Sequence, residues 1–229
     1  DPASGTLSVI NAEFKTPAAV NLDGKGNLWV VDTAAGELSR VDLANGRKHL
    51  VKKPNTALDN LAIAPDGTIY VSNMAALADK PAVPFRVPAG IKLDGNTLYV
   101  ADIFAFRQVD VSTGAVRDIH RMQASDLEYP FAVGLSAKQV LLSSWFTGSV
   151  QVRERSDMKV VDMLHGLKAP MDAQFLADGS IAIAEIATGS ITIASGAGFK
   201  ERRTLISGLG GPVQMVLGPD GKLYVTEAA

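Results

Sequence analysis

A hairpin motif that recurs six times along the chain constrains its fold more than any other feature. The last copy, GPVQMVLGPDGKLYVTE (residues 211–227), has apolar segments on both sides of Pro-Asp-Gly. Asp-Gly tolerates the positive φ of a tight turn, so this copy predicts two antiparallel strands joined by a turn. The pattern recurs at residues 17–32, 58–73, 88–102, 130–145 and 170–185.

The spacing of the copies predicts a propeller. Subtracting the positions of the residues that close each copy gives spacings of 41, 29, 43, 40 and 42. A strand-rich repeat near 40 residues is typical of a propeller blade, and no apolar stripe with helical spacing competes with it. The sequence therefore predicts an all-β, six-bladed β-propeller in a single domain, residues 1–229. The closing residues are Asp32, Asn73, Asp102, Trp145, Glu185 and Glu227.

The two ends of the chain look like complementary halves of one blade. Residues 5–14 (GTLSVINAEF) resemble the outer strands of later copies, whereas the last copy has no outer strands after it. We expect the N-terminal strands (about 5–14) to pair with the C-terminal hairpin (about 212–227), which would close the ring and remove exposed edges.

The second blade is expected to be reduced. Only residues 74–87 separate its hairpin from the next, and Pro81 and Pro84 remove ladder donors from that stretch. A tolerated shortening, residues missing from this chain, or a functional notch in the ring would explain the short spacing.

The composition favours some partners and excludes others. A net charge of −2 argues against a nucleic-acid partner, and no apolar run reaches the roughly 18 residues that a membrane span needs. The absence of cysteine excludes disulfides and thiolate metal sites. Because the chain begins with Asp1 rather than Met, we expect a processed extracytoplasmic protein, periplasmic or secreted, or a trimmed chain.

Residues at one repeat position form a ring in a propeller, and two such rings are candidate sites. The first is the set of closing residues named above, in which converging carboxylates suit a hard cation such as Ca²⁺. Its alternative role is to accept hydrogen bonds from loop amides between blades. Trp145 is the aromatic member of this ring.

The second ring lies two places after the proline of each motif, or after its equivalent Leu58. Its polar members are predicted to face a ligand at the channel mouth, with Asp59 and Trp145 beside them; alternatively, they hold channel waters. Asp172, Asn60 and Glu227 are the candidate metal ligands, with Ca²⁺ or Zn²⁺ as candidate cofactors, and no residue is assigned as catalytic. The ring consists of Ala19, Asn60, Gly90, Ala132, Asp172 and Gln214.

The three histidines are expected in the outermost strands of their blades. His49, His120 and His165 would then lie beyond hydrogen-bond reach of a substrate in the channel. This placement disfavours a Ser-His-Asp triad and a histidine-rich zinc site.

The hairpins GPDGKLYVTE, LDGKGNLWVVD and IAPDGTIYVSN resemble the repeats of NHL-type and SMP-30 (gluconolactonase)-like β-propellers, the group that includes streptogramin lyases. The resemblance covers nearly the whole chain and concerns blade architecture. It implies either a binding protein, a Ca²⁺- or Zn²⁺-dependent lactonase, or a lyase. It also implies a metal site near Asp59 and Asp172, although Asp59 stands where the lactonases have Asn and Asp172 is one place beyond their Asp.

Two functional hypotheses follow. The first is a binding or scaffolding propeller that recognises a small molecule or a protein partner on one face of the ring. The alternative is a divalent-metal-dependent hydrolase, lactonase-like, or a lyase, with its site at the channel mouth and the metal acting as a Lewis acid or activating water.

Overall fold

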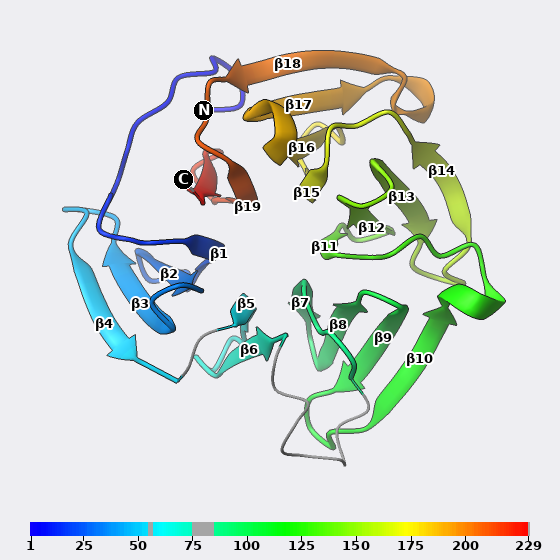
Figure 1. Ribbon diagram of the computed structural model, residues 1–229, viewed down its shortest axis with the longest axis horizontal. Helices are drawn as coiled ribbons and strands as arrows, with labels where there is room; N and C mark the ends of the chain where they lie inside the picture. The colour runs from blue at the N-terminus through cyan, green and yellow to red at the C-terminus, as the bar shows by residue number, and fades with distance from the viewer. Residues whose placement is uncertain (55–56, 75–84, 229) are drawn as a thin grey trace.

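The computed structural model describes residues 1–54, 57–74 and 85–228. Its strands form antiparallel sheets around a central axis, and the fold is an all-β propeller (Figure 1). The first strand of each sheet lies nearest the axis, and successive strands lie farther out. Among the described residues, no helix is long and apolar enough to cross a bilayer.

Four sheets are propeller blades with four strands each. Each blade is a meander, in which every strand pairs with its neighbours in sequence. The blades comprise β1 Pro17–Leu22, β2 Asn27–Asp32, β3 Glu37–Asp42 and β4 Lys48–Lys52; β7 Ile91–Asp94, β8 Thr97–Asp102, β9 Ala105–Asp110 and β10 Val116–Arg121; β11 Ala132–Leu135, β12 Gln139–Ser144, β13 Ser149–Glu154 and β14 Val160–Leu164; and β15 Pro170–Phe175, β16 Ile181–Glu185, β17 Ser190–Ser195 and β18 Glu201–Ser207.

Two further sheets are hairpins of two strands each. One pairs β5 (Leu58–Ile63) with β6 (Ile69–Asn73), and the other pairs β19 (Pro212–Leu217) with β20 (Leu223–Glu227). Short 3-10 turns follow β10, β16 and β17, at Met122–Ala124, Ile186–Thr188 and Ala197–Phe199.

The prediction of six blades is wrong. In the described part of the chain, four sheets have the four strands of a blade, and the copies at 58–73 and 211–227 form hairpins only. Each repeat contributes an inner hairpin, but a blade also needs two outer strands. A short proline-rich stretch of sequence follows the second copy, and its residues 75–84, where the notch is predicted, lie outside the described residues.

The predicted pairing of residues 5–14 with the C-terminal hairpin is also wrong. The segment contains no strand, and β20 pairs only with β19 within the described residues. The segment instead runs along the outside of the ring from β18 towards β1 (Figure 1). The Asn11 side-chain amide donates to the Gly46 carbonyl at 3.0 Å, and Lys48 donates to the Glu13 carbonyl at 2.8 Å. Val9 is 76% exposed, so its apolar side chain is not buried against β20.

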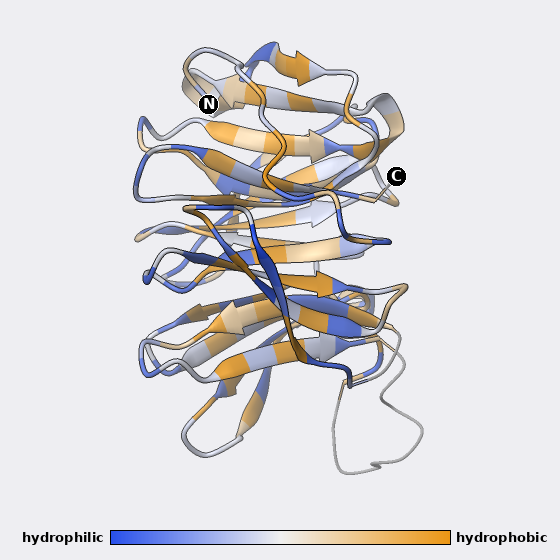
Figure 2. Ribbon diagram, turned by 90° about the vertical axis from the view of Figure 1, so that its left-hand side faces the viewer, coloured by the Kyte–Doolittle hydropathy of each residue, from blue (hydrophilic) through white to orange (hydrophobic). Residues whose placement is uncertain are grey.

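Side-chain packing between adjacent sheets closes the ring. Val20 and Val30 of the first blade pack against Val216 and Tyr224 of the β19–β20 hairpin. Equivalent apolar clusters lie at every other sheet-to-sheet boundary, as between Val152 and Ile183. Apolar and polar residues alternate along many strands in the side view (Figure 2), as expected for strands that bury side chains between sheets.

The predicted turns are confirmed. The glycines of the hairpin turns have positive φ, from 56° at Gly95 to 91° at Gly67. Because glycine adopts this region without strain, each Asp-Gly or related pair ends one inner strand and begins the next.

Candidate functional site

The carboxylates that close the second strands hold the loops between sheets. Asp32 is fully buried and accepts the Lys15 N–H at 2.7 Å and the Thr16 N–H at 3.1 Å. Asp102 accepts the Val87 N–H at 2.6 Å and pairs with Arg107 at 3.0 Å. Each acid therefore fixes the connection that leads into its own sheet's first strand.

Glu185 and Glu227 act in the same way. Glu185 accepts the Lys168 N–H at 2.5 Å and a hydrogen bond from the Thr192 hydroxyl. Glu227 accepts the Gly210 N–H at 2.5 Å. Asn73 ends β6 at the equivalent position.

The pKa of Asp32 reflects this structural use. Burial alone would raise the pKa of this carboxyl, but the N–H donors of Lys15, Ala35 and Thr16 outweigh the loss of water and hold the pKa below its usual value. The ionised form is thus the one that the connecting loop recognises.

The second ring forms hydrogen bonds across the inner strands. Gln214 accepts the Val20 N–H at 2.7 Å, and its amide donates to Asn60 Oδ1 at 2.9 Å. Both side chains are at least 95% buried. Asn60 Oδ1 also accepts the Leu61 N–H at 2.9 Å. Gln214 therefore links β19 to β5 across the intervening β1.

Asp172 makes the corresponding link on the other side of β19, from β15. Its Oδ1 accepts the Ala173 N–H and its Oδ2 accepts the Met215 N–H, both at 2.9 Å. The Gln174 amide donates to both oxygens at 3.1 Å. Burial raises the pKa of Asp172 to about 6, although the Lys92 charge and these donors oppose the rise.

The charges of Lys92 and Asp172 influence each other's pKa. Burial lowers the pKa of Lys92, and the Asp172 carboxylate opposes that shift. Lys92 lies on β7 and Asp172 on β15, with β11 between them. The two charges thus favour each other's ionised form.

Asp59 differs from its neighbours in the ring. It lies next to Asn60 on β5, in the irregular stretch between Leu58 and Leu61, and remains partly exposed. Desolvation raises the pKa of this carboxyl to about 7. At the equivalent position the other copies carry the uncharged residues Ala18, Ala89, Phe131, Met171 and Val213.

The candidate metal ligands Asp172, Asn60 and Glu227 do not form a site that fits a cation. The acceptor oxygens described for them already receive N–H donors, and the described residues contain no group of three or more His, Asp or Glu side chains arranged to hold a metal. Metal dependence stays a prediction. Chelation tests it directly.

We expect the thermal midpoint to change by less than about 1 °C when EDTA is added, because these oxygens stabilise the fold through N–H donors. The midpoint is measured with and without EDTA, followed by addition of Ca²⁺ or Zn²⁺. A fall of several degrees that one ion reverses would contradict this expectation, since an ion that binds only the native state raises its stability.

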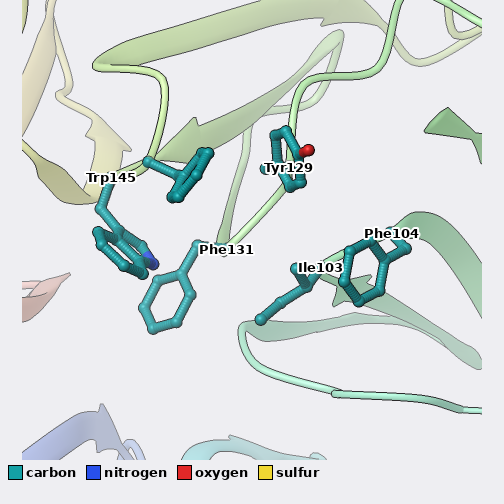
Figure 3. A pocket seen from close by; sticks show the side chains of 6 residues that line it. Ile103, Phe104, Tyr129, Phe131 and Trp145 are labelled. Carbon is teal, nitrogen blue, oxygen red and sulfur yellow. The ribbon is translucent and has the colours of Figure 1, made fainter.

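A pocket of about 180 Å³ lies at the end of the ring where the second strands end. Trp145 and Phe146 come from the β12–β13 turn, and Ile103 and Phe104 from the β8–β9 turn. The connection between β10 and β11 completes the lining with Tyr129 and Phe131. Figure 3 shows Trp145 and Phe131 on the side towards the centre of the ring.

Three of these side chains are well exposed: Phe104 is 43%, Trp145 45% and Phe146 67% exposed. The lining backbone is also unusual, since Ile103 has φ 32° and Tyr129 has φ 35°. Positive φ is strained for a β-branched or bulky residue, and such strain concentrates at functional sites.

Sequence reasoning singled out Trp145 but missed the other five lining residues. One available signal was Phe131, an aromatic residue at the repeat position that Asp59 occupies in the second copy. The apolar pair Ile103-Phe104, where a polar loop is expected after Asp102, was another. Their convergence depends on the angle between two blades, which the sequence does not report.

The histidines lie away from this pocket. His49 is on β4 and His120 on β10, the outermost strands of their blades, and His165 follows β14 directly. The His120 ring contacts the Met158 carbonyl at 3.2 Å.

Comparisons with known proteins identify the architecture. The chain matches no protein-family profile and no curated protein sequence. Among solved structures it is similar to virginiamycin B lyase from Staphylococcus aureus, with 17% identity and a TM-score of 0.68 over 96% of this chain and 80% of that one.

Two other solved structures are also similar. Kuenenia stuttgartiensis hydrazine synthase gives 20% identity and a TM-score of 0.66 over 95% of this chain and 75% of that one. A chain of a nidogen/laminin complex gives 16% identity and a TM-score of 0.68 over 83% of this chain and 80% of that one. At these identities the likeness shows the fold alone. By its fold, the chain is a β-propeller.

Proposed function

We propose that this protein is a binding propeller that holds an apolar part of a small molecule in the aromatic pocket between the β7–β10 and β11–β14 blades. The observation that carries the proposal is a cavity of about 180 Å³ whose lining, within the described part of the chain, is Ile103, Phe104, Tyr129, Phe131, Trp145 and Phe146.

The exposure of these side chains supports binding. Exposed aromatic rings forgo the burial that would stabilise the fold, at roughly 25 cal/mol per Å² of apolar surface. Three exposed rings line this hollow. A ligand that covers them would gain the free energy of burying their apolar surface. Ligand pockets are typically concave and apolar, and tryptophan and tyrosine are the side chains most often responsible for affinity.

The frame of the pocket supports the same role. Trp145 and Phe146 are held by the turn between β12 and β13, two paired strands of one blade. Phe104 is held by the turn between β8 and β9. Side chains placed by rigid sheets lose little conformational freedom on binding, which favours affinity.

The lining supports binding better than hydrolysis or bond lysis. Among the described residues, the lining has no carboxylate, imidazole or amine that could transfer a proton near neutral pH, and the Tyr129 hydroxyl is its one titratable group. The similarity to virginiamycin B lyase concerns architecture, and the histidines of this chain lie on or beside the outermost strands.

Replacing Trp145 with alanine is expected to weaken binding of indole, p-cresol and 3,3-dimethylbutan-1-ol at least about tenfold, because the variant loses one wall of the pocket. Dissociation constants are measured by calorimetry and ligand-observed NMR. Val161→Ala is the matched control, since Val161 is 49% exposed on β14, outside the pocket lining, and should bind like the wild type. Equal affinity in the wild type and Trp145→Ala, or no binding of any probe, would overturn the proposal.

A further inference from the structure

We propose that the aromatic pocket is a cage for a quaternary ammonium group carried by a small molecule. This inference rests on the proposed binding function and names the chemistry of its ligand.

The rings form walls at steep angles to one another. The Phe131 and Trp145 rings meet at 88° with centroids 6.4 Å apart, and Trp145 meets Phe146 at 87° and 5.8 Å. Tyr129 adjoins Phe146 at 4.9 Å and 50°. Phe104 continues the series, 6.2 Å from Tyr129 at 67°. Rings set in this way surround a hollow instead of filling it as a parallel stack (Figure 3).

The electrostatics of such walls favour a cation. The face of an aromatic ring carries the negative part of its quadrupole, and tryptophan attracts cations most strongly. An anion would meet the same negative faces and would be repelled.

The scarcity of polar atoms selects the kind of cation. Of the lining side chains that the structure describes, only Tyr129, through its hydroxyl, and Trp145, through its indole N–H, offer hydrogen-bonding groups. A primary ammonium would lose water from three N–H donors and find few acceptors in return. A quaternary ammonium has no N–H and presents a shell of methyl groups, so the apolar walls can hold it without leaving a donor unsatisfied.

An acid adjoins the pocket lining. Glu128 precedes Tyr129 and accepts the Ser149 hydroxyl at 2.8 Å. Among the salt bridges of the described residues, none involves this carboxylate. Its negative charge would favour a cation at this end of the pocket and disfavour an anion.

The test compares choline with 3,3-dimethylbutan-1-ol, the neutral isostere in which carbon replaces nitrogen. We expect the wild type to bind choline at least about fivefold more tightly, the preference that a cation–π contribution near 1 kcal/mol gives. Dissociation constants are measured at constant ionic strength by calorimetry and ligand-observed NMR, on protein whose thermal midpoint is unchanged.

Two variants separate the cation effect from apolar burial. Trp145→Leu keeps an apolar wall but removes the π face, so the choline preference should fall to near one. Trp145→Phe should retain part of it. If the isostere binds the wild type as tightly as choline, the cage is refuted while the binding function stands. If neither ligand nor any aromatic probe binds, the proposed function fails as well.

Discussion

Replacing Gly134 with alanine is expected to lower the free energy of unfolding by about 3 kcal/mol, the upper part of the usual range for overpacking a core. A Cβ at Gly134 would lie 2.3 Å from the Ala173 carbonyl oxygen and 3.2 Å from Leu141 Cβ. The first contact is with the backbone of β15, so relief would require β11 and β15 to move apart. That movement would disturb the buried Asp172 network on the same strand.

The free energy of unfolding is measured by urea denaturation, and the comparison is valid if the variant and the wild type have the same m-value. Gly24→Ala is the matched control, because Gly24 has φ 68° and a Cβ added there would meet no atom within 4 Å. It should cost only the backbone strain of a positive φ, roughly 1–2 kcal/mol. Equal losses in the two variants would show that the inner strands can separate without a large penalty.

Asp59→Asn is expected to raise stability at pH 8 and to flatten the pH dependence between pH 4 and pH 8. The folded-state pKa is about 7 and the ordinary value is 3.8. Between these values the folded state binds more protons than the unfolded state, so stability falls as pH rises through that window. Asparagine cannot ionise, and the variant therefore escapes this loss.

The size of the effect follows from the shift. Each pKa unit corresponds to about 1.36 kcal/mol, which gives up to about 4 kcal/mol for a fully buried group and about 2 kcal/mol for one that solvent partly screens. Thermal midpoints at several pH values measure it. Asp172, whose pKa is also raised, contributes in the same direction and is unaffected by the substitution at Asp59.

Asp66→Asn is the control for the Asp59 variant. Asp66 lies in the exposed turn of the same hairpin, and hydrogen bonds from the Thr68 N–H and hydroxyl lower its pKa. A carboxyl with a lowered pKa changes stability only at pH values below about 4. Asp66→Asn should therefore leave the fall in stability between pH 4 and pH 8 as it is in the wild type. A flattened profile in Asp66→Asn, or an unchanged profile in Asp59→Asn, would contradict the assignment to Asp59.

The hairpins could be predicted from the sequence because they depend on local interactions. Apolar segments on both sides of Asp23-Gly24 or Asp220-Gly221 specify two strands and a turn, whatever surrounds them. The recurrence of the motif near every 40 residues then indicates sheets around an axis. The outermost placement of His49 and His120 followed from the same reading and agrees with the structure.

The number of complete blades depended on non-local interactions. Residues 5–14 have the composition of outer strands, but a strand also needs a partner edge, and this segment contacts Gly46 and Lys48 of the first blade instead. Composition cannot distinguish a paired strand from an extended segment that lies over a sheet, since both favour the same residues.

The chemistry of the site was decided by tertiary structure as well. The sequence identified Asn60, Asp172 and Gln214 as polar residues of the inner strands, but not that Gln214 reaches across β1 to Asn60. It also identified Trp145, whereas Phe104, Tyr129 and Phe131 join Trp145 only where two blades meet. Local strand and turn preferences are encoded residue by residue. Which side chains share a cavity depends on the angles between sheets, and these are set by the packing of the whole ring.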